Sequence, residues 1–295
     1  MKLIFVGNIM ISLEVLKTIR QIDKNILAGI ITNTNKKPDS ARVDLFCKKF
    51  SIPYILSKNI NSLKTKKWIE SKNPDIILCV GWSQILKKEV LSIPKKYCIG
   101  FHPTKLPTNK GKHPIIWSII NDLKRSSTSF FLMNKKIDDG DVISQKNFII
   151  GKNEYVSSVY KKIIKNSKTQ IQNLIIKIKS GKLSVKKNKK KNNISNYWRK
   201  RTYNDGKIDF RMTGRSIFNL VRALSHPYPG AHFEHNNKDY KVFIIKYKKT
   251  KKENNIESGK ILDLNKQGIK IKCEDGFVYI KKTIPSIKLK KGMYL

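Results

Sequence analysis

The 295-residue sequence predicts an α/β domain built on a mostly parallel sheet, followed by a small β-barrel domain. In the first part of the chain, short apolar segments alternate with segments whose apolar residues recur at helical spacing, which is typical of parallel sheets. After Tyr197, short strand-like segments separated by turn residues replace that alternation. We therefore expect a first domain over 1–185, a linker over 186–196 and a second domain over 197–295.

The expected strands of the first domain are short, apolar and bounded by turn residues. They span 2–6, 26–32, 53–56, 75–80 and 99–102. Ser12 is expected to be the N-cap of a helix that carries Val15, Leu16 and Ile19 on one face. Further helices are expected near 44–50, 63–71 and, as a long amphipathic helix stopped by Gly181, from 154 to 179.

The second domain is expected to start with a helix over 214–224, which the sequence HPYPG at 226–230 ends. Short strands are then predicted at 241–247, 259–262, 269–273 and 277–281. Between the two patterns lies the run KKNKKKNN at 186–193, which we interpret as part of the linker.

The net charge of +41 comes from 62 basic and 21 acidic residues. A field of this sign attracts polyanions such as nucleic acids. However, only eight of the basic residues are arginine, and the chain is also rich in Ile and Asn, whose codons share the AT-richness of the lysine codons. No aromatic residue interrupts the dense run at 186–193. We attribute the charge to codon bias, with a polyanion site as the alternative.

The four cysteines lack C-x-x-C spacing, so the sequence predicts neither a zinc site nor a disulfide framework, and it suits a reducing cytoplasm. No apolar run approaches the ~18 residues of a membrane span. The opening MKLIFVGNIM is interpreted as a strand and turn rather than a signal peptide. Neither a G-x-G-x-x-G nor a Walker-type phosphate loop is present. We expect a cytoplasmic protein without metal or membrane partner.

The segments most informative about chemistry are GFHPTKLPTNKGKHPIIW at 100–117 and IDDGDVISQ at 137–145. His102 follows a buried strand, and ligands bind at the carboxyl ends of strands in open α/β sheets. A distant carboxylate such as Asp138 could fix the imidazole tautomer and raise its basicity, which suits proton transfer. Taken alone, each residue has a simpler interpretation, as a surface histidine and a turn aspartate.

Together these segments resemble the formyltransferases that use 10-formyltetrahydrofolate, a family that acts on methionyl-tRNA, glycinamide ribonucleotide or amino sugars. The matching positions are His102, Leu106-Pro107, Lys110-Gly111 and Asp138-x-Gly140-x-Val142-Ile143. The segments 197–210 and 217–233 also resemble the second domain of the tRNA and sugar enzymes, which the glycinamide ribonucleotide enzymes lack. The resemblance implies a Rossmann-like first domain, an OB-like second domain and an enzyme that transfers one-carbon groups.

The mechanism implied by the resemblance is direct formyl transfer from the folate to an unprotonated amine, through a tetrahedral oxyanion. His102 would stabilise the oxyanion and move protons, and Asp138 would orient His102. The family's asparagine falls on Gly100, which has no side chain to donate to the oxyanion. Asn109 is the expected replacement donor; a backbone N–H, an ordered water or an inactive protein are the alternatives.

The resemblance also implies folate contacts, with the pterin held in a slot of loop backbone. The implied positions are Gln84, Ile85, Leu86, Lys112, Asn134, Lys136 and Ile137. For Leu86 and Trp82 the alternative is ordinary core packing, and for Lys112 it is a solvated lysine.

Three features bear on the acceptor. The basic loop that tRNA formyltransferases carry after their second strand is absent from 32–53. The segments KHPIIW at 112–117 and HPYPGA at 226–231 resemble sugar N-formyltransferases. We therefore expect a nucleotide-linked amino sugar destined for a surface polysaccharide such as lipopolysaccharide, with initiator tRNA as the alternative and a non-catalytic folate-binding module as a third. The expected cationic partners of the sugar diphosphate are Lys110, Lys112, His113 and Arg125. The resemblance is compatible with a homodimer.

Overall fold

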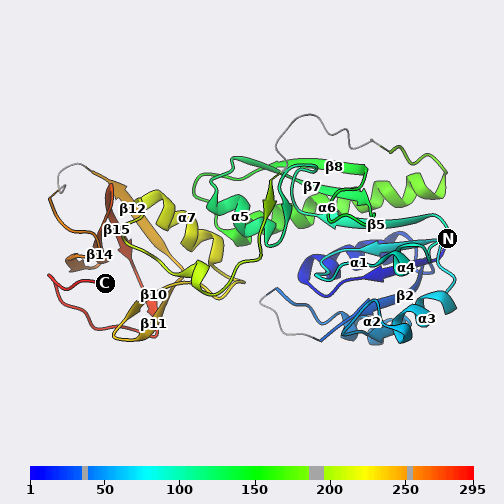
Figure 1. Cartoon of the computed structure of the whole chain (residues 1–295), viewed down its shortest axis with the longest axis horizontal. Helices are drawn as coiled ribbons and strands as arrows, with labels where there is room; N and C mark the ends of the chain where they lie inside the picture. The colour runs from blue at the N-terminus through cyan, green and yellow to red at the C-terminus, as the bar shows by residue number, and fades with distance from the viewer. Residues whose placement is uncertain (35–38, 186–195, 251–254) are drawn as a thin grey trace. The chain divides into compact units, whose positions relative to one another are not determined.

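The computed structural model describes residues 1–34, 39–185, 196–250 and 255–295, and these form two compact units (Figure 1). The first unit comprises residues 1–114, 125–149 and 161–199, and the second comprises 115–124, 150–160 and 200–295. Apart from Asn196, the predicted linker lies outside the described residues. The domain bounds 1–185 and 197–295 stay a prediction.

A seven-stranded sheet of order β3-β2-β1-β4-β5-β7-β8 forms the centre of the first unit. Its strands are β1 Leu3–Val6, β2 Leu27–Thr32, β3 Tyr54–Leu56, β4 Ile76–Cys79, β5 Tyr97–His102, β7 Arg125–Leu132 and β8 Val142–Ile149. The first five are parallel, and β7 and β8 are added antiparallel. The mostly parallel α/β sheet predicted from the sequence is therefore confirmed.

The helices of the first unit lie where the sequence predicts them, except for the short helix at 88–91, which the sequence does not predict. They are α1 Met10–Ile22, α2 Val43–Lys49, α3 Leu63–Ser71, α4 Lys88–Leu91 and most of α6 Val156–Lys179. In Figure 1, α2 and α3 lie near β2, and α6 runs beside β7 and β8. The predicted N-cap at Ser12 is wrong because α1 already begins at Met10. The Ser12 hydroxyl instead accepts the Ile9 N–H (3.1 Å) from inside the first turn and donates to the Val80 carbonyl (2.6 Å).

Helix α6 contacts β7 and β8 through buried polar side chains as well as apolar ones. Gln170 of α6 accepts a hydrogen bond from the Thr128 hydroxyl (2.5 Å) and donates to the Thr128 carbonyl (3.2 Å) and the Ser144 hydroxyl (2.9 Å). Because Gln170 is 4% exposed, these bonds satisfy an amide that water cannot reach. They hold α6 against β7 and β8, the two strands that the turn containing Asp138 connects.

The second unit contains three helical segments: α5 Pro114–Ile120, the first turn of α6 and α7 Gly214–Leu224. Pro114, the first residue of α5, belongs to the first unit. Buried Arg222 of α7 holds these segments together by donating to the carbonyls of Glu154 (2.8 Å) and Gly151 (3.3 Å), and it also contacts Asp122 (3.2 Å). Burial, and to a smaller extent the neighbouring Arg215, lowers the pKa of Arg222.

The strands of the second unit form two antiparallel sheets. One has the order β10-β11-β16 and the other β12-β15-β14-β13. Their bounds are β10 Ala231–His235, β11 Lys238–Val242, β12 Ile245–Lys249, β13 Ile261–Asn265, β14 Gly268–Cys273, β15 Gly276–Ile280 and β16 Thr283–Ile284. The antiparallel domain is confirmed, but its described strands do not close into the expected barrel. The single strand predicted at 241–247 is wrong, because the chain passes from one sheet to the other at Phe243–Ile244.

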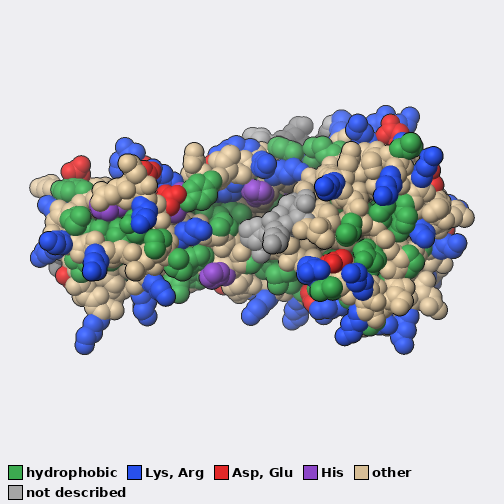
Figure 2. Space-filling view, turned by 90° about the horizontal axis from the view of Figure 1, so that it is seen from below, with side chains coloured by type: hydrophobic (Ala, Val, Ile, Leu, Met, Phe, Trp, Pro, Cys, Tyr) green, Lys and Arg blue, Asp and Glu red, His purple; other side chains and the backbone are tan. Residues whose placement is uncertain are grey.

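On the face shown in Figure 2, Lys and Arg side chains are spread over each unit rather than gathered in one stripe. This distribution agrees with a compositional origin of the +41 charge. Within the described residues, no helix is long and apolar enough to cross a bilayer.

Candidate active site

The structure brings His102 and Asp138 together at one edge of the first unit's sheet. His102 is the last residue of β5, and Asp138 lies in the turn between β7 and β8. Their Nδ1 and Oδ2 atoms are 3.6 Å apart, and the side chains are 6% and 17% exposed. The contact is longer than a hydrogen bond, and it places the carboxylate beside the imidazole ring. The pairing expected from the sequence is therefore geometrically present.

The other ring nitrogen of His102 faces the loop that follows β5. Its Nε2 atom lies 3.0 Å from the carbonyl oxygen of Asn109, which also accepts a hydrogen bond from the Thr104 hydroxyl (2.8 Å). A carbonyl oxygen can only accept, so this contact places a proton on Nε2. A ring protonated at both nitrogens can interact favourably with both Asn109 and Asp138, and such a cation can stabilise a developing oxyanion.

The Asp138 carboxylate is fixed from the same loop. The Gly111 N–H donates to its Oδ2 atom (3.1 Å), and the neighbouring Lys110 and Asp139 form an ion pair. Asp138 itself has a φ of +51°, a conformation that costs a non-glycine residue free energy. In the same turn a Cβ on Gly140 would lie 1.5 Å from the Leu132 carbonyl oxygen, so only glycine fits there. Close packing of this turn therefore determines where the carboxylate lies.

Gly100 sits two residues before His102, and the aromatic ring of Phe131 fills the space beside it. A Cβ at Gly100 would lie 2.7 Å from the Phe131 ring and 3.0 Å from the Met133 side chain. The sequence anticipates the missing amide but not the ring that replaces it. Asn109, the expected substitute donor, is half-buried, and its side-chain amide forms no hydrogen bond with any residue that the structure describes. Its catalytic role stays a prediction.

The first predicted folate loop is held by a pair of side-chain amides. Gln84 accepts the Ile60 N–H (2.9 Å) and donates to the Lys58 carbonyl (2.5 Å). Asn61 reciprocates by donating to the Ile85 carbonyl (2.9 Å) and accepting the Lys87 N–H (2.8 Å). Both polar atoms of the Gln84 amide are therefore used inside the protein. A ligand at this loop would meet its backbone and the 51% exposed Ile85 side chain.

The remaining predicted folate positions divide by their surroundings. Leu86 is 2% exposed and belongs to the hydrophobic core, whereas Ile137 of the second loop is 37% exposed. Asn134 shapes that loop by accepting the Lys136 N–H (2.8 Å). Lys112 donates to the Ser83 carbonyl (2.7 Å) and so ties the loop after β5 to the first predicted folate loop.

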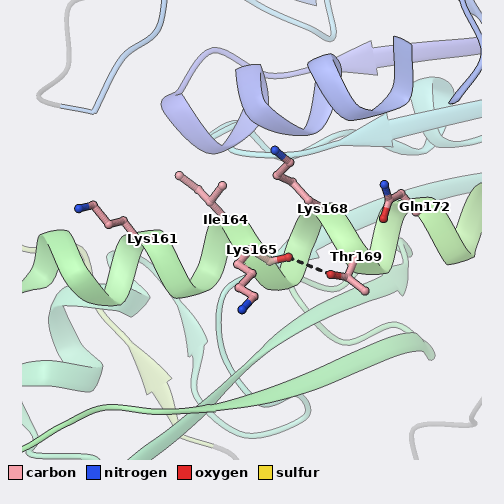
Figure 3. A pocket seen from close by; sticks show the side chains of 6 residues that line it. All are labelled: Lys161, Ile164, Lys165, Lys168, Thr169 and Gln172. Atoms are coloured by element: carbon pink, nitrogen blue, oxygen red, sulfur yellow. Dashed lines mark hydrogen bonds between the residues drawn. The ribbon is translucent and has the colours of Figure 1, made fainter. Parts of the chain in front are cut away.

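Two further candidates for binding or catalysis can be set aside. A groove of about 380 Å³ runs along α6 and is lined by Lys161, Ile164, Lys165, Lys168, Thr169 and Gln172 (Figure 3). The hydrogen bond drawn there joins Thr169 to the carbonyl of Lys165 within the helix, and no predicted site residue lines the groove.

Burial, with smaller contributions from Cys98 and Asp138, raises the pKa of the Cys79 thiol, so it is not a nucleophile at neutral pH. No group of three or more potential metal ligands occurs in the described residues.

Comparison with known proteins gives matches along nearly the whole chain. The family described as "Formyl transferase" matches residues 5–175, and "Formyl transferase, C-terminal domain" matches 200–290. Methionyl-tRNA formyltransferase of Clostridium beijerinckii is 32% identical over 214 residues, which cover 72% of this chain and 68% of that protein. The bifunctional polymyxin resistance protein ArnA of Wigglesworthia glossinidia brevipalpis is also 32% identical, over 76% of this chain but only 33% of its own length.

The fold is also similar to that of a solved sugar formyltransferase. The structure of WlaRD, a sugar 3N-formyl transferase crystallised in the presence of dTDP and 5-N-formyl-THF, aligns with a TM-score of 0.70 and 20% identity. The alignment covers 97% of this chain and 99% of that one.

Proposed function

The chain belongs to the formyl transferase family, and from this premise we propose that it transfers a formyl group from 10-formyltetrahydrofolate to the amine of a nucleotide-linked amino sugar. The observation that carries the proposal is the contact of His102 with Asp138, together with the loop around them. The matched regions cover both units and include both of these residues.

In the proposed reaction, the residues of the site manage charge and protons. Attack of the amine nitrogen on the formyl carbon forms a C–N bond and places negative charge on the formyl oxygen. To stabilise that charge directly, the His102 Nε2–H would turn from the Asn109 carbonyl to the formyl oxygen, while Asp138 offsets the positive charge of the ring. Collapse of the adduct breaks the bond to the folate nitrogen, which must receive a proton that the amine releases. His102 would relay that proton.

The loops that would hold the folate fit a flat, partly apolar ring. Ile85 and Ile137 place exposed apolar side chains on the two predicted loops, and the amides of Gln84 and Asn61 hold the first loop in shape. The Nε1 atom of Trp82, on the same loop, is buried without a hydrogen-bond partner among the described residues. Exposed apolar surface beside backbone donors and acceptors is typical of small-molecule sites.

The sugar acceptor is supported by sequence and by structural similarity. The segments 112–117 and 226–231 resemble those of sugar enzymes, and WlaRD, whose fold is similar, is a sugar formyltransferase. Lys110 is paired with Asp139 and Lys112 with the Ser83 carbonyl, so both would have to exchange partners to bind a diphosphate. Of the cations expected at the diphosphate, Arg125 and His113 are exposed.

Methionyl-tRNA is the second candidate acceptor, because methionyl-tRNA formyltransferases are among the proteins most similar to this chain in sequence. The deciding experiment offers purified protein 10-formyltetrahydrofolate with UDP-, dTDP- and GDP-linked amino sugars and, separately, with charged initiator tRNA. Mass spectrometry should detect a formyl group on a sugar nucleotide. Formylation of the tRNA alone would replace the proposal with the second candidate, and folate binding without transfer to any amine would exclude both.

A further inference from the structure

A short segment near the end of the first unit lies directly against the catalytic loop. Strand β9 (Tyr197–Trp198) pairs in parallel with β6 (Lys110–Gly111). The Lys110 N–H donates to the Asn196 carbonyl (3.1 Å), and the Lys112 N–H donates to the Trp198 carbonyl (2.9 Å). A segment distant in sequence thus supplies the strand partner of the loop that contains the reactive groups.

The side chain of Asn196 extends this pairing toward His102. Its Oδ1 atom accepts the Asn109 N–H at 2.6 Å, across 87 positions of sequence. Asn109 has a φ of +56°, in the left-handed region, which asparagine adopts more readily than most residues. Its carbonyl oxygen is the atom that contacts His102 Nε2. The Asn196 side chain therefore bonds to the peptide group before the Asn109 Cα. The carbonyl that contacts the ring belongs to the next peptide group, whose Lys110 N–H donates to the Asn196 carbonyl (3.1 Å), so Asn196 holds the Asn109 backbone on both sides.

The same segment also reaches the Asp138 side of the pair. Gly111, whose N–H donates to the Asp138 carboxylate, has a φ of +103°, and a Cβ there would lie 2.3 Å from the Trp198 carbonyl oxygen. The segment 196–198 therefore fixes both residues, Asn109 through Asn196 and Gly111 through Trp198. Displacement of this segment would move the partners of both nitrogens of His102.

We propose that Asn196 is a positioning residue for formyl transfer: its side chain holds the backbone of Asn109, whose carbonyl orients His102. The expected loss of kcat rests on the proposed function, whereas the expected change in the orientation of the His102 ring does not. Asn196 is exposed, so its replacement removes one acceptor without opening a cavity in the core. A misplacement of the order of 1 Å at a reacting group can reduce a rate about 10²-fold.

The test compares two substitutions that differ in one property. Asn196→Leu removes the acceptor oxygen and should lower kcat at least tenfold, with little change in KM for either substrate. Asn196→Asp keeps an acceptor oxygen and should retain most of kcat. Asn173→Leu, at an exposed position of α6, is the matched control and should behave as the wild type. Wild-type kcat in Asn196→Leu, or equal losses in Asn196→Leu and Asn196→Asp, would overturn the proposal.

A second readout separates this inference from the proposed function. The ¹⁵N signals of the His102 ring, assigned by comparison with His102→Gln, should shift in Asn196→Leu and stay near their wild-type positions in Asn196→Asp. If the wild type formylates none of the offered amines, the proposed function fails while these signals still test the positioning. Unchanged ring signals in a folded Asn196→Leu protein would overturn the inference whatever the activity.

Discussion

At the scale of single residues, the proposed chemistry depends on the His102 ring, whose two nitrogens both face oxygen atoms. His102→Ala removes the group that would stabilise charge and relay the proton, and it should lower kcat by about 10²–10⁴-fold. Asp138→Asn removes the negative charge beside Nδ1 and should lose most activity as well. Steady-state kinetics measure both effects, with His235→Ala in the second unit as the control. Near wild-type kcat in either variant would show that the assignment is wrong.

Gly100 has a steric reason to remain glycine that the sequence does not reveal. We expect Gly100→Asn to lower the melting temperature, because the new Cβ meets the Phe131 ring at 2.7 Å. Overpacking of this kind typically costs about 1–3 kcal/mol. Phe131→Ala made in the Gly100→Asn background should then destabilise less than Phe131→Ala alone, as thermal unfolding of the four proteins can measure. Additive effects would mean that the ring and the new side chain do not compete for space.

Asn109 combines a constrained peptide with a side-chain amide that has no hydrogen-bond partner among the described residues. Asn109→Ala removes that amide, and Asn109→Gly, which adopts the φ of +56° without strain, is the control for any change of the backbone. If the amide serves the oxyanion, kcat should fall on the order of 10²–10³-fold while KM changes little. An Asn109→Ala enzyme with wild-type kcat would exclude the side chain and leave a backbone N–H or water as the donor.

At the scale of elements, the sequence predicts what local patterns encode and misses what depends on distant contacts. The helices at 63–71 and 214–224 match their predicted bounds, because caps and apolar spacing are local. The strand predicted at 241–247 is two strands, since the continuous apolar run conceals a change of sheet. The pairing of β6 with β9 could not be predicted from the sequence, because strands of two residues are too short to show an alternating pattern. Likewise, Lys110 is visible as a motif position, but its ion pair with Asp139 is not.

The buried amide of Gln170 gives a test of how α6 is held on the sheet. Gln170→Leu keeps most of the volume but leaves the Thr128 and Ser144 hydroxyl groups without this partner. An unsatisfied buried polar group costs about 1–3 kcal/mol, so the free energy of unfolding should fall by about that amount. Chemical denaturation measures the loss, and Gln172→Leu, at an exposed position of the same helix, should change stability little. An equal effect of the two substitutions would contradict a specific role for Gln170.

At the scale of the whole molecule, family and architecture were accessible from the sequence because a motif spread over two segments is more specific than any of its residues. The acceptor is less accessible, because it depends on side chains whose partners only the fold defines. Lys112, predicted at the folate and the diphosphate, is an example: it donates to the Ser83 carbonyl and joins two loops of the site. The net charge of +41 is equally ambiguous in sequence, since compositional bias and a polyanion site predict the same number.

The salt dependence of turnover resolves that ambiguity. A polyanionic acceptor held by many lysines releases counterions on binding, so its affinity falls steeply with salt, whereas a sugar nucleotide offers only two phosphates. We therefore expect kcat/KM for the sugar acceptor to fall only modestly between 50 and 200 mM salt, on the order of tenfold at most. Replacing the five lysines at 186–191 with Ser and Asn should change that dependence little. If charged tRNA is the acceptor that reacts, a loss of 10³-fold or more over this range, made smaller by the lysine substitutions, would instead assign the charge to nucleic-acid binding.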